Sequence, residues 1–265
     1  MIAHLAFVLT LIMIVFLAIC LVVIGVSYAK TRKRSNNYFD KQDLELRYFI
    51  QKQVDYNQQV IGYECLLRQH NQDDTWSLPK AMDEMPLQRV IFLLEETFKS
   101  LPEEKITLSI NLSYEQIMSP EFNYFVRWAI SKIEPMQLAV ELHIDRKRAR
   151  VREYQFKRKI ETAKAYGMQF AIDNVGSKLS NLKNIEPLLS EVDILKCSMR
   201  SFRKDDPAVW LDLNLQFWNK LAKDHNIQLV LMGVEDEQDE ALAEQLKINW
   251  RQGYLFGKPM GTGKL

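Results

Sequence analysis

The sequence predicts a TIM-like (β/α) barrel preceded by a single transmembrane helix, and three observations support this fold class. Short apolar strands alternate with amphipathic helices along most of the chain, which is typical of a parallel sheet covered by helices. Successive strands end in polar residues, and the functional side chains of such barrels lie at the carboxyl ends of strands. The N-terminal segment, in contrast, is apolar and uncharged.

Residues 5–28 contain no charged side chain and are followed by a basic cluster at 30–34. About 20 apolar residues are enough for a helix to cross the hydrocarbon core of a bilayer. The basic cluster predicts that the chain after the span lies in the cytoplasm. We therefore expect an N-terminal transmembrane anchor at 1–29, a basic and polar linker at 30–43, and a barrel domain at 44–265. The protein would be a single-pass protein of the cytoplasmic membrane.

Charge and cysteine content narrow the class of protein further. The net charge is +1 for the whole chain, and the cluster at 30–34 carries +4, which leaves −3 from residue 35 onward. A mildly acidic domain has no general attraction for a nucleic-acid polymer, so we expect none as a partner. Cys20, Cys65 and Cys197 have no C-x-x-C spacing, which favours free thiols in a reducing compartment.

The chain after the linker reads as repeated strand and helix units. We expect strands at 60–68, 106–113, 137–144, 169–173, 193–199, 227–234 and 251–257. We expect helices at 87–101, 122–133, 152–166, 210–224 and 236–247, with a short helix beginning near residue 182. The loops between these segments are short, which favours closure of the sheet into a barrel.

Six polar residues lie in these strands near their ends and predict one shared site. They are Glu64, Asn111, Glu141, Asp173, Lys196 and Gln252. The first four offer the oxygen ligands that a hard divalent cation such as Mg²⁺ or Mn²⁺ prefers. Lys196 is suited to polarise a water molecule or to neutralise a developing oxyanion.

Seven motifs in this part of the chain resemble those of the EAL-type cyclic di-GMP phosphodiesterases, in the family's order. They are ECLLR at 64–68, NLS at 111–113, VEL at 140–142, AIDNVG at 171–176, VDILK at 192–196, GVE at 233–235 and QGYLF at 252–256. The resemblance extends over residues 43–259. It implies a TIM-like barrel that binds cyclic di-GMP and, with two metal ions, opens one phosphodiester to give the linear dinucleotide.

The resemblance also implies roles for individual residues. It assigns the first metal to Glu64, Asn111, Glu141 and Asp173. It places Leu67 and Arg68 at the ligand, with Arg68 contacting a phosphate. Lys196 and Gln252 match the lysine and glutamine that help to place the attacking water.

Four other family positions are changed in this chain. Asn174 and Ser198 stand where the family has aspartates, and Met232 stands where it has a glutamate; these three positions serve the second metal. Ile144 replaces a glutamate that steadies the loop over the site. Since two-metal cleavage uses both cations to stabilise the attacking and leaving oxygens, we expect the second metal site and most of the hydrolysis to be lost.

We therefore predict a membrane-anchored, degenerate EAL domain that acts as a cyclic di-GMP receptor or docks a protein partner. The alternative is an active phosphodiesterase that hydrolyses cyclic di-GMP to linear pGpG, with Asn174 still ligating through its carbonyl oxygen. The basic run at 146–159 is either a solvated helix face, a contact with anionic lipid headgroups or a docking surface for an acidic protein.

Overall fold

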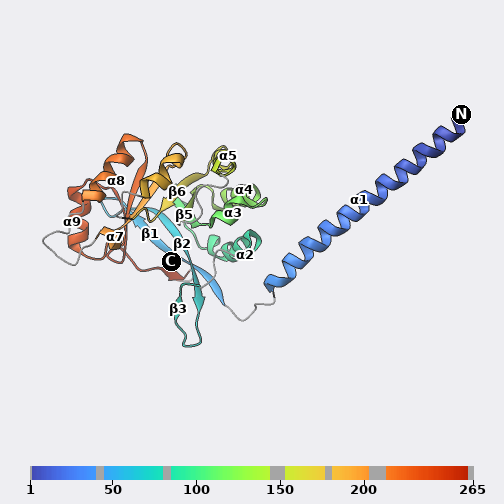
Figure 1. The fold of residues 1–265 in the computed structure, drawn as a ribbon. Coiled ribbons are helices and arrows are strands. Elements are labelled where there is room, and N and C mark those ends of the chain that lie inside the picture. The colour runs from blue at the N-terminus through green and yellow to red at the C-terminus, as the bar shows by residue number, and fades with distance from the viewer. Residues whose placement is uncertain are drawn as a thin grey trace. The chain divides into compact units, whose positions relative to one another are not determined.

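The computed structural model describes residues 2–39, 45–79, 85–143, 153–176, 181–202 and 213–261 (Figure 1). Contacts divide the chain into two compact units, Met1–Glu45 and Leu46–Leu265. The second unit carries every strand of the described chain and all of the residues predicted to form the site.

The N-terminal unit consists of one helix, α1 (Ile2–Phe39). Its segment Leu9–Val26 is long and apolar enough to cross a membrane, a property that a signal sequence shares. The helix continues through Phe39, so residues 30–39 of the expected linker are helical. Residues 40–44 lie outside the described residues.

Eight strands of the second unit form a closed barrel, which confirms the predicted fold class (Figure 1). Their order around the barrel is β1-β9-β8-β7-β6-β5-β4-β2, and β1 pairs again with β2. They are β1 (Leu46–Val54), β2 (Val60–His70), β4 (Thr107–Asn111), β5 (Gln137–His143), β6 (Gln169–Asp173), β7 (Ile194–Ser198), β8 (Gln228–Met232) and β9 (Trp250–Gln252). Strands β2 and β4 to β9 run parallel, so their carboxyl ends meet at one rim.

Strand β1 is the main element that the sequence analysis did not predict. It runs antiparallel to both β2 and β9 and so closes the barrel. Its sequence, LRYFIQKQV, contains the polar run Gln51-Lys52-Gln53, which is typical of an exposed strand or a loop. In the structure Gln51 and Gln53 are buried. Two short strands, β3 (Trp76–Ser77) and β10 (Met260–Gly261), extend the sheet beside β2 and β1.

Helices follow most of the parallel strands. They are α2 (Leu87–Phe98), α3 (Tyr114–Met118), α4 (Phe122–Ile133), α5 (Glu153–Lys164), α6 (Leu182–Ile185), α7 (Met199–Phe202), α8 (Leu213–Asp224) and α9 (Glu237–Gln245), with a 3-10 turn at Glu186–Leu188. Large side chains such as Phe122, Phe125, Phe170 and Trp218 fill the main apolar core. This packing fixes the strands and leaves their other faces to line the barrel.

The barrel interior is layered. Ala139, Ala171, Ile194 and Val230 form a small separate apolar cluster, against which Met232 and Trp250 pack. Because successive side chains of a strand alternate between its faces, the residue two positions later on each strand also faces the interior. On three of these strands that residue is charged, namely Glu141, Asp173 and Lys196. The apolar layer therefore forms a floor beneath a polar rim.

Candidate functional site

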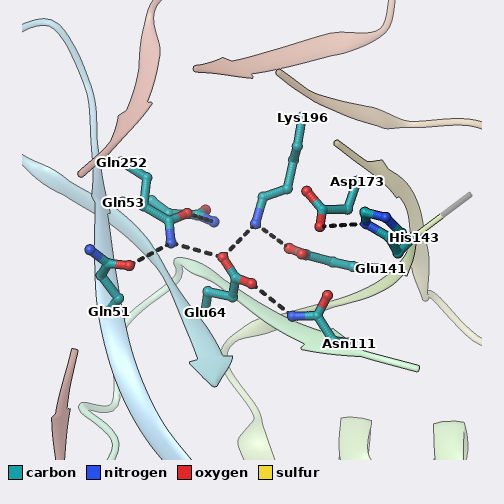
Figure 2. Close-up of polar contacts among 9 residues, drawn as sticks. All are labelled: Gln51, Gln53, Glu64, Asn111, Glu141, His143, Asp173, Lys196 and Gln252. Atoms are coloured by element: carbon teal, nitrogen blue, oxygen red, sulfur yellow. Dashed lines mark hydrogen bonds and ion pairs between the residues drawn. The ribbon is translucent and has the colours of Figure 1, made fainter. Parts of the chain in front are cut away.

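Lys196 lies at the centre of the polar rim (Figure 2). Its Nζ is 2.8 Å from Glu64 Oε2 and 2.6 Å from Glu141 Oε1. All three side chains are buried, so water contributes little to stabilising their charges. Burial opposes the charge of Lys196, but the surrounding carboxylates outweigh it and raise the pKa of the ammonium. The lysine therefore stays charged and serves as an internal counter-ion.

Glu64 accepts hydrogen bonds at both carboxylate oxygens. Asn111 Nδ2 donates to Oε1 over 2.7 Å, and Gln252 Nε2 donates to Oε2 over 2.8 Å. Burial by itself would raise the pKa of Glu64, but the Lys196 charge and the hydrogen bonds from Lys196, Gln252 and Asn111 lower it below its usual value. Glu64 is thus held as a carboxylate.

Glu141 also pairs with Lys196, but it has fewer hydrogen-bond donors around it than Glu64 has. It is fully buried, and neither oxygen accepts a well-directed hydrogen bond, although Oε1 forms the close ion pair with Lys196. Burial and the nearby charge of Glu64 raise the pKa of Glu141 to about 8, with Lys196 opposing the rise. Two buried carboxylates share one ammonium, so the pair retains a proton near neutral pH.

Asp173 ends β6 beside this pair. Its Oδ1 is buried without a hydrogen-bond partner, and its Oδ2 lies 3.6 Å from His143 Nδ1. His143 faces the site because it lies two residues after Glu141 on β5. The sequence analysis gave His143 no role in the site, and its alternation with Glu141 is the signal that would have placed it there.

The oxygen atoms left without partners fit a bound cation. Glu141 and Asp173 contribute buried oxygens without hydrogen bonds, and Glu64 and Asn111 stand next to them (Figure 2). This set suits Mg²⁺ or Mn²⁺. In the described ranges, no three acidic, histidine or cysteine side chains already converge as metal ligands. Lys196 pairs with only one oxygen of Glu141, so Glu141 Oε2 and Asp173 Oδ1 stay available to a cation.

Gln252 joins the site to strand β1. Its Nε2 donates to Gln51 Oε1 over 3.1 Å as well as to Glu64, and its Oε1 accepts from Gln53 Nε2 over 3.0 Å (Figure 2). Gln51 in turn donates to the backbone oxygen of Gly257 over 2.9 Å. Neither Gln51 nor Gln53 was among the predicted site residues, because their strand was not predicted.

Arg68 and Leu67 occupy different environments at the end of β2. Arg68 is half-buried, and its Nη1 donates to the backbone oxygen of Leu67 over 2.9 Å. Burial lowers the pKa of Arg68, and the charge of Glu64 opposes the change. The Leu67 side chain lies in the main apolar core on the outer face of the strand. Only the Leu67 backbone is therefore near the rim.

Asn174, Ser198 and Met232, which stand where the resemblance expects carboxylates, lie outside the cluster around Lys196. Asn174 is exposed, adopts a left-handed backbone with φ of 52°, and accepts a hydrogen bond from Ser201 Oγ over 3.3 Å. Ser198 and Met232 are half-buried partners in adjacent strands, and Met232 packs on the apolar floor. Ile144 lies outside the described residues.

The basic run at 146–159 is described only from residue 153, within α5. Lys157 contacts Ser190 and Glu191, and Lys159 donates to the backbone oxygen of Ser119. Two of the three basic side chains in the described part thus make contacts within the domain. The lipid and partner-docking hypotheses for this run stay predictions.

Comparison with known proteins identifies the family. The EAL domain profile matches residues 34–259. Two curated proteins of Escherichia coli K12 are similar: the probable cyclic di-GMP phosphodiesterase PdeA (33% identical over 101 residues, 38% of this chain and 13% of PdeA) and the probable cyclic di-GMP phosphodiesterase PdeB (23% identical over 223 residues, 77% of this chain and 40% of PdeB). The chain thus spans well under two thirds of either relative.

A solved structure shows the same fold. The EAL-domain protein YkuI of Bacillus subtilis, in complex with its substrate cyclic di-GMP and calcium, superposes with a TM-score of 0.65 at 18% identity, over 82% of this chain and 56% of YkuI. At this identity the likeness concerns the fold alone. The profile match over most of the sequence shows that this chain belongs to the EAL domain family, and the sequence similarity to PdeA and PdeB shows that it is homologous to cyclic di-GMP phosphodiesterases.

Proposed function

We propose that this chain is a degenerate EAL domain that binds cyclic di-GMP without hydrolysing it at a useful rate. One observation carries the proposal: the charged half of the site is assembled around Lys196, whereas Asn174, Ser198 and Met232 supply no carboxylate to the other half. The protein is then a receptor that passes the nucleotide signal to a protein partner.

The charged half has the groups needed to bind an anionic nucleotide. Glu64, Asn111, Glu141 and Asp173 would hold one Mg²⁺ or Mn²⁺, which supplies positive charge to a bound phosphate. Arg68, half-buried at the rim, offers a planar guanidinium to a second phosphate oxygen. Lys196 keeps the buried carboxylates compensated while the site is empty.

The other half lacks what two-metal hydrolysis requires. A second cation stabilises the leaving oxygen in such reactions, and hard cations are held by carboxylates. The amide of Asn174 and the hydroxyl of Ser198 carry no charge, and the thioether of Met232 is a poor ligand for a hard cation. Three negative charges are therefore missing where the family's second cation would bind.

The active phosphodiesterase remains the second candidate, since the Glu64, Lys196 and Gln252 contacts are intact. The triple variant N174D/S198D/M232E separates the two candidates. We expect hydrolysis to linear pGpG, followed by chromatography, to appear in the triple variant and to be absent from the wild type. Equal turnover in both proteins would contradict the receptor proposal.

The direct test is titration of cyclic di-GMP into the full chain in detergent micelles with Mn²⁺ or Ca²⁺. We expect saturable binding without product, and we expect R68A to weaken binding while R89A, a change on helix α2, leaves it unaltered. Steady metal-dependent turnover would overturn the proposal. So would absence of binding at tens of micromolar, which would leave a scaffold for protein contacts.

We further propose that helix α1 anchors the protein in the cytoplasmic membrane through residues 1–29, with the barrel in the cytoplasm. The apolar window Leu9–Val26 and the basic cluster at 30–34 support this location. Alkaline extraction should leave the protein in the membrane pellet, and a C-terminal tag should resist protease added to intact spheroplasts. A released, soluble barrel would identify α1 as a signal sequence instead.

A further inference from the structure

Gln53 occupies an unusual position for a glutamine. Its side chain is 1% exposed and points into the barrel from β1, opposite Gly62 on β2. A Cβ added at Gly62 would lie 3.0 Å from Gln53 Oε1 and 2.7 Å from the backbone oxygen of Thr107. The glycine thus leaves the space that the buried amide of Gln53 fills.

The orientation of the Gln252 amide follows from its neighbours. A carboxylate such as Glu64 can only accept hydrogen bonds, so Gln252 must direct its amide NH2 group toward it. The second N–H of this group donates a hydrogen bond to Gln51 Oε1. The amide NH2 group of Gln51 in turn donates to the backbone oxygen of Gly257. With both of its donors used in this way, Gln252 turns its carbonyl toward Gln53 (Figure 2).

Gln53 supplies a donor to that carbonyl. Its Nε2 donates to Gln252 Oε1 over 3.0 Å, and both side chains are buried. A buried carbonyl without a donor is unfavourable, so the contact favours this orientation over the reversed amide. The reversed amide would also bring the Gln252 carbonyl against the Glu64 carboxylate.

We propose that Gln53 is a positioning residue for Gln252. It holds the side-chain amide of Gln252 with its NH2 group toward Glu64 and its carbonyl oxygen toward Gln53. Gln252 then acts as a fixed donor to the cation ligand Glu64, and its carbonyl points toward Gln53 rather than toward Glu64. This inference rests on the proposed function and deepens it, because it names a residue that supports the cation ligand Glu64 through Gln252.

The test uses Mn²⁺ alone as the probe, with its affinity for the full chain measured by electron paramagnetic resonance. We expect Q53M, which keeps the volume but removes the donor, to weaken Mn²⁺ binding about tenfold, the lower end of the effects seen for outer-shell partners of metal ligands. Q53E keeps the shape but favours the reversed amide, so its loss should be at least as large. The matched control is Q116M, because Gln116 is also a buried glutamine that donates from its amide, to Met85 in the segment before α2.

A double-mutant cycle distinguishes positioning from simple packing. If Gln53 acts through Gln252, Q53M should cause no further loss of Mn²⁺ affinity in a Q252M background. An equal loss in both backgrounds, or wild-type affinity in Q53M and Q53E, would overturn the inference.

The proposed function can fail separately. Mn²⁺ binding without cyclic di-GMP binding would contradict the receptor role and leave this cycle valid. If the wild type bound no Mn²⁺, the melting temperature of the barrel would be measured instead for Q53M, Q252M and the double variant. Non-additive losses for Q53M and Q252M would then support the contact, and additive losses would refute it.

Discussion

The two halves of the site differ in how the protein itself uses their side chains. In the first half, Glu64 and Glu141 face the buried ammonium of Lys196, so their charges are compensated without any ligand. In the second half, Asn174 faces solvent, and Met232 packs on apolar side chains. Glu64 and Glu141 lie beside the ammonium of Lys196, which balances their charge. Positions 174, 198 and 232, where only a bound metal ion would balance a carboxylate, carry uncharged side chains. The internal ion pairs of the first half therefore stand without a ligand, whereas the second half has no such pairs among the described residues.

Among the tests of this contrast, we expect the largest effect from the substitution K196M. The substitution leaves the buried pair of Glu64 and Glu141, which carries one negative charge near neutral pH, without its counter-ion. Removing one partner of a buried ion pair typically costs about 3–5 kcal/mol. We expect a large fall in the unfolding free energy of the barrel, measured by urea denaturation of the full chain in micelles. K99M is the matched control, because Lys99 forms an ion pair with Glu96 in which both side chains are mostly exposed. Equal stability of the two variants would refute the counter-ion role.

The second prediction concerns pH. Burial and the charge of Glu64 raise the pKa of Glu141 from its usual value of 4.5 to about 8, so the folded barrel holds a proton that the unfolded chain releases. The stabilising effect of this proton is complete below about pH 4.5 and is lost as pH rises to about 8, by at most about 1.4 kcal/mol per pH unit. Without added metal, the melting temperature should fall over this window in the wild type.

E141Q is the control for the pH prediction, because an amide has no proton to release in this range. The fall in melting temperature attributable to residue 141 should be absent in E141Q, and the two proteins should differ most at the alkaline end of the window. Parallel pH profiles for the two proteins would show that Glu141 is not the group responsible.

The third prediction extends the contrast to Met232. In M232E, a carboxylate enters a half-buried position beside the apolar floor, where a polar group without a partner costs about 1–3 kcal/mol. We expect a moderate loss of stability by urea denaturation, and we expect Mn²⁺ to restore part of it in the N174D/S198D/M232E background. A loss that Mn²⁺ leaves unchanged would mean that the three restored carboxylates do not form a cation site.

The smallest effect is expected for N174D. Residue 174 is exposed and has positive φ, and aspartate tolerates this conformation and can still accept from Ser201. The unfolding free energy should change by less than about 0.5 kcal/mol. N174A should cost more, about 1–2 kcal/mol, because alanine is strained in the left-handed region. An equal cost for both variants would show that neither the backbone conformation nor the hydrogen bond from Ser201 decides this position.

The sequence alone was sufficient to predict the barrel and its polar rim. The parallel strands could be read from short apolar runs, and helix α4 begins and ends where the periodicity predicted. Glu64, Asn111, Glu141 and Lys196 were expected at one site and do come together there. These predictions depend on local pattern and on the rule that parallel strands end at a common rim.

Strand β1 and its two glutamines depended on the tertiary structure. Polar residues on a strand are read as exposed unless the partner that buries them is known, and Gln53 reaches its partner Gln252 across 199 residues. The sequence placed His143 on its strand but not its side chain beside Asp173, which depends on the register of β5 with β6.

The sequence by itself therefore determined which chemical groups are available to this protein and on which strands they lie. The tertiary structure decided which of those groups neutralise one another, because contacts such as the one between Lys196 and Glu64, 132 residues apart, depend on strand register and burial. That pairing sets the charge state of the site. A list of residues at strand ends cannot supply it, since the pKa of each carboxylate is fixed by how deeply it is buried and by which cation it faces.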